Sequence, residues 1–505
     1  MKKILLGIFI VFSPIIFAQK NTVNVEKTEK VFGYNNSTNS DIVGYEYKFP
    51  QKIFEYNLYL NNLSVQLKDR NKGLVILYDI ARDSIKWTKN ISYDKNIFRQ
   101  FGDKIVFESN RNMLLDIENG NKKYNILSDN EIAFADKNNK VGIGHKFGNE
   151  KILMATNLEN GEVLWQKKIK NSFDLDRIID INDTSLLVIS NGLHQIDVNS
   201  GKGWSVAMKT SVGNGGAAAG AVLGGVLFGA IGGAIGGAMA GDMAFGIESN
   251  LLYNNDFAYI ASSEKIAKIS LKNGEILWKT FFEKNEASSS YIFEDNRLIY
   301  MLNFGYAYQN IDIKKNRVKY GKSFVAAFDK ENEGKTKFIY YLGKKEIISD
   351  FYFTENNIFL VINDNLKVFS KKQEKIINEK DFDYFDYFIE YEYFEYFINN
   401  AEKFVNLNDL DNTKVFAVTK NGNVISIDDE LNIETILPSK DLYLNYLNTD
   451  NYRFISNNTE TFIIDNFGSK IAEISASSDA VLIDNILYDK KDNCLISIDL
   501  TEILK

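Results

Sequence analysis

The sequence is poor in several residues that mark whole classes of protein. It contains one cysteine, Cys494, three prolines and two histidines among 505 residues. A single cysteine cannot form an internal disulfide, so stability must come from a packed core, and Cys494 is expected to be a buried, inert thiol. His145 and His194 cannot supply a three-histidine zinc site, and neither stands in a ligand spacing.

The chain also lacks an excess of positive charge. Lysine and arginine total 59 against 67 acidic residues, which gives a formal net charge of −8 at pH 7. Nucleic acids bind to basic faces, so the composition argues against a nucleic-acid partner. Hydrophobic residues make up 45% and aromatic residues 13% of the chain. That is ample material for one large or two medium-sized domains.

Sequence motifs of catalysis and cofactor binding are absent as well. The chain has no nucleophile elbow, phosphate-binding loop or dinucleotide fingerprint. The nearest approach to a calcium loop is DLDN at 409–412, which lacks the glycine and the distal glutamate of such a loop. We therefore expect no catalytic residues, no bound cofactor and no metal site.

What is present begins with an export signal. Lys2 and Lys3 precede an apolar run at 4–17, which ends in Ala18 and Gln19. This layout predicts a signal peptide over 1–18 and a mature chain over 19–505. A retained anchor is the alternative, but the apolar run is shorter than the roughly 20 residues of a membrane span. We expect an exported protein, periplasmic or extracellular, whose association with a membrane stays open.

A repeated motif organises the rest of the chain. Residues 157–165 read NLENGEVLW, residues 270–278 read SLKNGEILW, and residues 79–87 read DIARDSIKW. In each, a turn-opening polar residue precedes a tryptophan by eight positions. A copy at 197–204 is one residue shorter, and a copy at 116–124 ends in tyrosine. The aromatic residues, which include every tryptophan of the chain, are Trp87, Tyr124, Trp165, Trp204 and Trp278.

Each copy is predicted to be a β-hairpin. The residues on both sides of the turn alternate between apolar and polar, which is typical of half-buried strands. Gly161, Gly201 and Gly274 stand where the turn requires a positive φ. The closing aromatic residue is expected to pack against the neighbouring hairpin. The first four copies start 37 to 41 residues apart, which is the length of a four-stranded propeller blade.

This pattern of an aspartate or its equivalent, a glycine turn and a terminal tryptophan resembles the repeat of quinoprotein-like, pyrroloquinoline-quinone-type β-propellers. The resemblance is clear from about residue 60 to 285 and fainter towards the C-terminus, near Asp329, Asp428, Asp465 and Asp499. It implies an all-β propeller of about seven or eight four-stranded blades. We expect the last strand, over 494–500, to pair with an N-terminal segment and close the ring.

The resembled family marks a fold more than a function. It includes quinone-dependent dehydrogenases and the cofactor-free propeller of the outer-membrane protein assembly machinery. The adjacent-cysteine disulfide of many quinone enzymes cannot form here, because the chain has a single cysteine. The resemblance therefore favours the non-enzymatic branch without fixing a role.

A glycine-rich insertion interrupts the repeat between Asp197 and Ser270, which are 73 residues apart. The segment 212–241 is mostly glycine and alanine, and five of its glycines follow at every fourth position. These are Gly225, Gly229, Gly233, Gly237 and Gly241. On a helix they would share one face, so we expect a glycine zipper in the form of a helical hairpin that contacts a membrane or self-associates as a homo-oligomer. A solvated loop is the alternative.

A second unusual segment, DFDYFDYFIEYEYFEYF, spans 381–397. Ten of its seventeen residues are aromatic and six are acidic. The spacing fits a short amphipathic helix, and the aromatic content also fits strands. The segment is either an insertion packed by its own aromatic residues or an exposed platform with an acidic rim for a protein or glycan.

Together these features favour a non-catalytic, exported propeller that acts as a protein-binding scaffold in the cell envelope. Its rim and central face would bind an envelope protein, with the glycine zipper as an accessory element. Two other functions stay open. One is a pyrroloquinoline-quinone-dependent oxidoreductase, and the other is a secreted glycan- or polymer-binding protein.

Overall fold

The computed structural model describes most of the chain as β-structure. The described residues are 23–93, 95–108, 112–126, 130–146, 149–168, 177–182, 184–189, 192–209, 246–295, 297–311, 314–343, 346–389, 394–398, 403–406, 414–457 and 459–504. Within these ranges the only helix is a single 3-10 turn, η3 (Ser439–Asp441). The signal peptide expected at 1–18 and the glycine zipper expected at 212–241 lie outside the described residues, so the helical hairpin has no counterpart in them.

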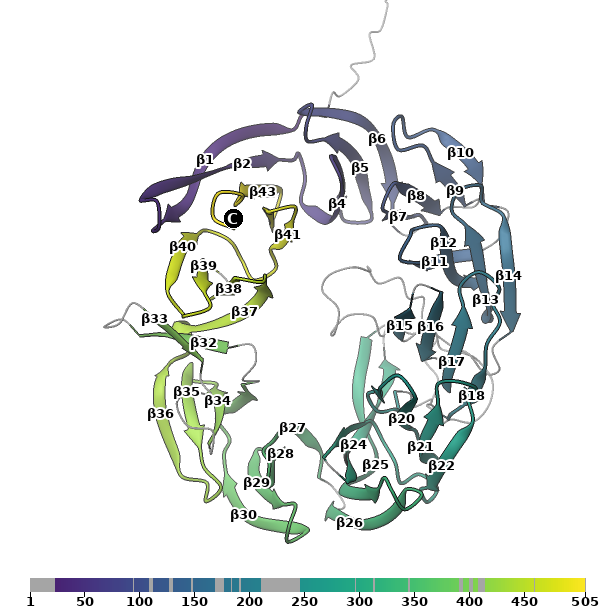
Figure 1. Cartoon of the computed structure of the whole chain (residues 1–505), viewed down its shortest axis with the longest axis vertical. Coiled ribbons are helices and arrows are strands. Elements are labelled where there is room, and N and C mark those ends of the chain that lie inside the picture. The colour runs from purple at the N-terminus through teal and green to yellow at the C-terminus, as the bar shows by residue number, and fades with distance from the viewer. Residues whose placement is uncertain are drawn as a thin grey trace, which may run out of the picture.

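The strands form successive antiparallel sheets arranged in a ring (Figure 1). In each blade the first strand lies towards the centre and the fourth at the rim. Blade one is β3 (Ile53–Tyr59), β4 (Asn62–Asp69), β5 (Lys72–Asp79) and β6 (Ser84–Ser92). Blade two is β7 (Ile97–Phe101), β8 (Lys104–Glu108), β9 (Met113–Leu115) and β10 (Lys122–Asn125). Blade three is β11 (Asn130–Ala135), β12 (Val141–Lys146), β13 (Asn149–Asn157) and β14 (Val163–Lys168).

The next four blades repeat this plan. Blade four is β15 (Arg177–Asn182), β16 (Ser185–Ile189), β17 (Gly192–Asp197) and β18 (Ser205–Ala207). Blade five is β19 (Leu252–Tyr253), β20 (Phe257–Ala261), β21 (Lys265–Ser270) and β22 (Ile276–Phe281). Blade six is β23 (Ser290–Glu294), β24 (Leu298–Ile311), β25 (Lys314–Asp329) and β26 (Lys335–Gly343). Blade seven is β27 (Ile348–Phe353), β28 (Asn357–Ile362), β29 (Asn365–Ser370) and β30 (Lys375–Asp381).

Blade eight carries an insertion. Its strands are β31 (Phe385–Phe388), β34 (Val415–Thr419), β35 (Asn423–Ile427) and β36 (Ile433–Pro438). The insertion is the hairpin of β32 (Phe394–Ile398) and β33 (Lys403–Asn406), which lies in sequence between the first two strands of blade eight. Its strand β32 pairs with β37 of the next blade. Blade nine is β37 (Leu442–Asn448), β38 (Tyr452–Ser456), β39 (Thr461–Asp465) and β40 (Lys470–Ile474).

The tenth blade closes the ring with both ends of the chain. Its inner strands are β41 (Val481–Ile483), β42 (Ile486–Lys491) and β43 (Cys494–Asp499), and its fourth strand is the N-terminal β2 (Ser40–Lys48). The register runs from Gly44 opposite Ile498 to Lys48 opposite Cys494. The prediction that the last strand pairs with an N-terminal segment is thus confirmed. Outside β2, β1 (Glu26–Asn35) also pairs with β40, so it joins blades nine and ten at the rim.

The predicted blade number was wrong. The described strands form eight separate four-stranded sheets, and the eleven-stranded sheet contains two more four-stranded blades, which gives ten. The fainter repeat copies near Asp329, Asp428, Asp465 and Asp499 all lie at the ends of third strands. A hairpin forms from local interactions and carries no information on the angle between blades. The repeat therefore predicts the structure of a blade, whereas the number of blades depends on how they pack against one another.

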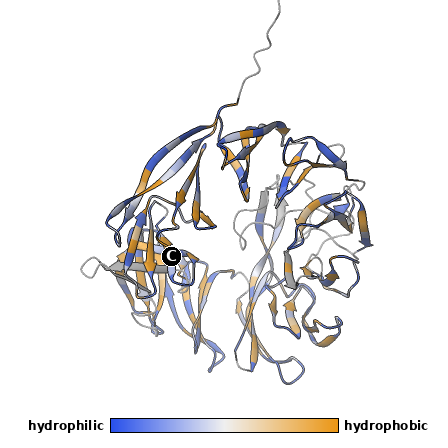
Figure 2. Cartoon of the chain, turned by 45° about the horizontal axis from the view of Figure 1, so that its top comes forward, coloured by the Kyte–Doolittle hydropathy of each residue, from blue (hydrophilic) through white to orange (hydrophobic). Residues whose placement is uncertain are grey.

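The hydrophobic core is divided among the contacts between neighbouring blades. One cluster joins Val75, Leu77 and Trp87 of blade one to Phe98 and Ile105 of blade two, and most of the others likewise join two neighbouring blades. Figure 2 shows hydrophobic and hydrophilic residues mixed along the strands of the ring. The middle strands are the most buried, and every residue of β28 and β34 is buried, because a blade lies against each of their faces.

In eight of the ten blades, the turn between the third and fourth strands contains a side-chain hydrogen bond that accounts for the polar residue at the start of the repeat. The side chain of the turn-opening residue accepts a hydrogen bond from a backbone N–H two or three residues later, which fixes the turn. The acceptors with their donor residues are Asp79 (Arg82), Asp116 (Glu118), Asn157 (Glu159), Asp197 (Ser200), Asp329 (Glu331), Ser370 (Gln373), Asp428 (Glu430) and Asp465 (Phe467). In blade ten Asp499 makes the same bond to Thr501.

Candidate functional site

The rim tryptophans lie on fourth strands or, for Trp204, directly before one, and they reach into the next blade. The indole Nε1 donates a hydrogen bond from Trp87 to the carbonyl oxygen of Ile117 at 3.0 Å and from Trp165 to that of Val198 at 2.8 Å. Trp204 donates in the same way to Leu271 at 3.0 Å. In all three cases the acceptor directly follows the residue that opens the next blade's turn. The indole therefore links each blade to the following turn.

The turn glycine lies under the same indole. A Cβ added to Gly201 or Gly274 would lie 2.6 Å from the Cδ2 atom of Trp165 or Trp204, respectively. Both glycines have a positive φ, of 67° and 74°. Glycine is thus required twice, once by the backbone conformation and once by the close approach of the ring.

Two of the five rim aromatic residues depart from this arrangement. Trp278 packs over Gly334, but its buried Nε1 has no hydrogen-bond acceptor among the described residues. Tyr124 is 41% exposed, and the glycine of the following turn, Gly161 (φ 78°), lies instead against the backbone of Asn125. Every residue of β10 is exposed, so the phenol of Tyr124 does not pack against the next blade as the indoles do.

At the centre of the ring, polar side chains join the first strands of neighbouring blades. A first strand is a sheet edge with unpaired backbone groups, which need other partners. The amide of Asn250 supplies both partners for Ile292 of β23, accepting from its N–H at 2.7 Å and donating to its carbonyl at 2.9 Å. Asp350 of blade seven accepts a hydrogen bond from the N–H of Phe388 in blade eight at 2.9 Å. These side chains hold successive blades in register.

The most charged of these links surrounds Arg99 on β7. Its Nη1 atom lies 3.0 Å from Oε1 of Glu108, and its Nη2 atom lies 3.7 Å from Oε1 of Glu131 in blade three. Arg99 and Glu108 together bind the carbonyl and the N–H of Ile132 on β11. On the other side, Gln66 donates to Glu55 of blade one at 2.8 Å. We call Glu55, Gln66, Arg99, Glu108 and Glu131 the Arg99 cluster.

Burial perturbs the carboxyl groups of the Arg99 cluster. Desolvation raises the pKa of Glu108 to about 7, and the nearby Glu131 adds to the rise while Arg99 opposes it. Burial also raises the pKa of Glu55, against the opposing charge of Arg99. Three carboxylates thus share one guanidinium, and Glu108 can exchange a proton near neutral pH. The sequence alone did not predict this cluster. The one sign of it there is Glu108, the charged residue that ends the largely apolar strand KIVFE of β8.

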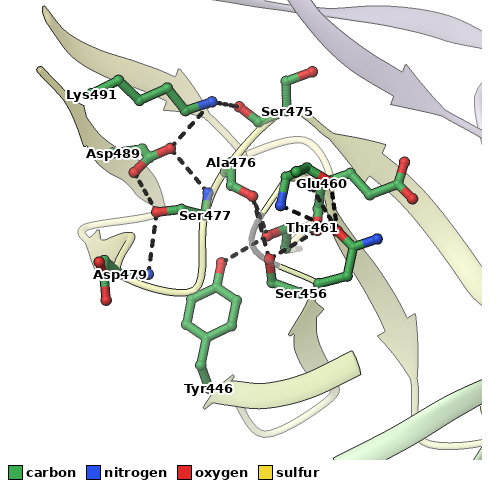
Figure 3. A network of polar contacts seen from close by, with 12 residues as sticks. Tyr446, Ser456, Glu460, Thr461, Ser475, Ala476, Ser477, Asp479, Asp489 and Lys491 are labelled. Atoms are coloured by element: carbon green, nitrogen blue, oxygen red, sulfur yellow. Dashed lines mark hydrogen bonds and ion pairs between the residues drawn. The ribbon is translucent and has the colours of Figure 1, made fainter. Parts of the chain in front are cut away.

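A second polar network ties blade nine to the closing blade (Figure 3). The carboxylate of Asp489 on β42 is fully buried and accepts hydrogen bonds from the N–H and Oγ of Ser477 at 3.0 and 2.7 Å. Lys491 Nζ lies 3.6 Å from the same carboxylate. The carbonyl of Ala476 accepts from Thr461 of blade nine at 2.9 Å. The connector between the two blades is therefore held from both sides.

The aromatic and acidic segment 381–397 is β-structure where it is described, so the helical interpretation is wrong there. Phe382, Phe385 and Phe388 are buried in the core between blades seven and eight. Tyr384 and Tyr387 are exposed, at 40% and 41%. Between 381 and 389 the segment thus packs through its phenylalanines and presents its tyrosines to solvent, while the side chains of 390–397 lie outside the described part of the chain.

The structure adds little to the other sequence candidates. His194 is buried on β17, and Cys494 is half-buried at the start of β43, where burial raises the pKa of its thiol. The loop 409–412 lies outside the described residues. Across the residues that are described, no three metal-binding side chains gather as a candidate ion site. In that same part of the chain, no helix has the length and hydropathy of a membrane span.

Comparisons with known proteins found distant likenesses among solved structures. No protein-family model matches the sequence, and no curated protein matches it. The solved structures that it resembles include BamB from Moraxella catarrhalis, with 12% identity over 75% of this chain and 95% of that one and a TM-score of 0.32. The Pan2 WD40 domain of Neurospora crassa is 10% identical over 73% and 88% of the two chains, with a TM-score of 0.30. The dihydro-heme d1 dehydrogenase NirN, in complex with DHE, is 12% identical over 65% and 66%, with a TM-score of 0.25. The chain is similar to propellers that differ in function, so this likeness leaves its function undetermined.

Proposed function

We propose that this protein is an exported, non-catalytic propeller that binds a protein partner in the cell envelope. The observation that carries the proposal is the hairpin of β24 and β25. These strands have 14 and 16 residues, and they pair as far as Ile311 opposite Lys314. Among the described ranges, the strands of the other blades have at most nine residues, and the rim strand β1 has ten. We call residues 304–322 of this hairpin the β24–β25 arm.

The arm has the composition of a protein-binding element. Tyrosine and arginine are among the side chains that most often dominate binding energy at protein interfaces. The Arg317 guanidinium lies over the ring of the buried Tyr306 at 4.8 Å, and that ring contacts the half-buried Tyr308 at 5.7 Å between centroids. The side chains of Arg317 and Lys319 are exposed. Because the whole chain has a net charge of −8, this basic arm favours an acidic surface of another protein.

The base of the arm is fixed to the blade, which would limit the entropy lost on binding. Tyr341 donates a hydrogen bond to the buried carboxylate of Glu286, and Lys322 Nζ lies 3.4 Å from the same group. The amide of Asn303 accepts a hydrogen bond from the N–H of Ser288 at 2.8 Å. The arm is therefore presented by a rigid support.

Site-specific photo-crosslinking tests this proposal. A photoreactive residue at Arg317 is expected to capture one dominant envelope protein, whereas the same residue at the exposed Lys122 on the rim is not. Reversing both charges, with Arg317→Glu and Lys319→Glu, should abolish the crosslink from a reactive residue at Tyr320. Equal capture from both positions, or none from the arm, would contradict an arm-mediated function. Reduction of a dye by the protein with pyrroloquinoline quinone and calcium would instead support the oxidoreductase alternative.

A glycan-binding function has one observation in its favour, the exposed pair of Tyr384 and Tyr387. Aromatic side chains of this kind stack on sugar rings, and Asp383 and Asp386 would accept hydrogen bonds from hydroxyl groups. Glycan-array binding that disappears in Tyr384→Ala and Tyr387→Ala, and persists in the arm variants, would favour this second function.

A further inference from the structure

The N-terminal strand β1 leaves half of its outer edge open. Its inner edge pairs with β2 from Glu26 to Asn35. On its outer edge, Gly33 to Asn35 pair with β40, and the carbonyl of Phe32 accepts a hydrogen bond from the N–H of Ser475 at 2.7 Å. No strand in the described part of the chain pairs with this outer edge between Glu26 and Val31. An open edge carries a row of free backbone donors and acceptors that can bind another strand.

The sequence along this edge is complementary to itself when reversed. Residues 25–31 read VEKTEKV. In an antiparallel pair of two copies with Thr28 at the centre, Glu26 stands opposite Lys30 and Lys27 opposite Glu29. Val25 stands opposite Val31, and Thr28 faces Thr28. Every cross-strand pair in this register is therefore favourable, because each glutamate faces a lysine, valine faces valine and threonine faces threonine.

An exposed apolar surface lies beside the same edge. Val31 is 59% exposed and directly opposite Val43 in the hairpin, which is 44% exposed. Tyr45, two residues further along β2, is 40% exposed, with Lys27 Nζ over its ring at 4.2 Å. A second copy would extend this surface across the twofold axis. The occupant that the pattern fits is therefore another molecule of this chain.

We propose that two copies of this protein associate through their β1 edges, antiparallel, with Thr28 on the twofold axis. Charged residues on an edge strand often serve to prevent such pairing. Here they alternate so that only this register joins every positive side chain to a negative one. A slip by one residue would place Lys27 opposite Lys30, so the charges select the register as well as the partner.

Charge reversal tests the proposal directly. The double variant Glu26→Lys/Glu29→Lys makes the edge positive, and Lys27→Glu/Lys30→Glu makes it negative. Each variant alone should weaken self-association by roughly tenfold or more, measured by analytical sedimentation of the purified protein over a range of concentrations. Mixed together, the two variants should form a heterodimer. Circular dichroism and the midpoint of thermal unfolding would show that both variants fold.

Cysteine crosslinking tests the register. In a Cys494→Ser background, Thr28→Cys should oxidise to a disulfide-linked dimer, because opposite Cα atoms in an antiparallel pair lie about 4.5 to 5.5 Å apart. Ser37→Cys, in the exposed turn between β1 and β2, is the matched control and should remain monomeric. A wild-type protein that stays monomeric at high concentration would overturn the proposal. So would a dimer that both charge-reversed variants retain, since another surface would then hold it.

Discussion

The indole of Trp204 donates a hydrogen bond to the carbonyl oxygen of Leu271 across 67 residues of sequence. The glycine-rich insertion lies between them, yet the contact matches those of Trp87 and Trp165, whose acceptors are 30 and 33 residues away. The insertion therefore leaves the contact between blades four and five unchanged. The link between an indole and the next turn belongs to the blade, whatever the connection contains.

The glycine under an indole should be much less tolerant of substitution than an equivalent glycine elsewhere. Gly274 and Gly422 both have a φ of 74°. An added Cβ would lie 2.6 Å from Trp204 at Gly274, but no closer than 3.4 Å to any atom at Gly422. We expect Gly274→Ala to lower the free energy of unfolding by roughly 2 to 4 kcal/mol, and Gly422→Ala by about 1 kcal/mol, from backbone strain alone. Urea denaturation measures both, and equal losses would contradict the role assigned to the ring.

The hydrogen bond of the rim tryptophan can be separated from its packing. Trp165 and Trp278 are similarly buried, at 9% and 8% exposure, but only the Nε1 of Trp165 has an acceptor among the described residues. Replacing each with phenylalanine removes the same ring volume. Trp165→Phe should cost about 1 kcal/mol more in unfolding free energy, because it leaves the carbonyl of Val198 without its donor. Chemical denaturation of the two variants checks the difference, and a larger loss for Trp278→Phe would be inconsistent with it.

The Arg99 cluster should make stability depend on pH in a defined direction. The pKa of Glu108 is raised to about 7 in the folded state, so between its ordinary value and pH 7 the folded state holds a proton that the unfolded state has lost. Stability therefore falls as pH rises through this range, by roughly 2 to 3 kcal/mol. Glu108→Gln cannot titrate and should lack this fall. Glu55 is present in both proteins, so the difference between their denaturation curves at pH 5, 6, 7 and 8 reports Glu108.

The buried carboxylate of Asp489 should control the closure of the ring. Asp489→Asn replaces one acceptor oxygen by a donor that faces the N–H and hydroxyl of Ser477. We expect a loss of roughly 2 to 4 kcal/mol in unfolding free energy. Hydrogen exchange of residues 475–480 should speed up before that of blades one to eight. Asp428→Asn, at an exposed turn, is the control and should leave that exchange unchanged.

Much of the blade could be predicted from the sequence, because its determinants are local. The turn-opening side chain, the positive φ of the glycine and the alternating strands all act within about ten residues. The turn that begins at Ser370 was not predicted, because its local residues lack the features of the repeat. It has a serine acceptor, a glutamate at the positive-φ position, Glu374 (φ 57°), and no closing aromatic residue. Its hydrogen bond is present, but its residues do not distinguish it from other polar turns.

The candidate sites could not be predicted in the same way. Arg99, Glu108 and Glu131 are charged residues on short strands, and nothing in their spacing shows that they meet. Asp489 and Ser477 come together only when the connector between blades nine and ten folds back over β42. The charge pattern of β1 is visible in the sequence, but only the structure leaves that edge open.

The sequence by itself determined the repeating hairpin, the rim tryptophans with their glycines, and the net acidic charge, since each depends on neighbouring residues or on composition. Tertiary structure decided the ten blades, the closure of β43 on β2 and the gathering of charges at the centre. These depend on the angle at which whole blades pack. That angle arises from many contacts between residues distant in the chain, and no local pattern encodes it.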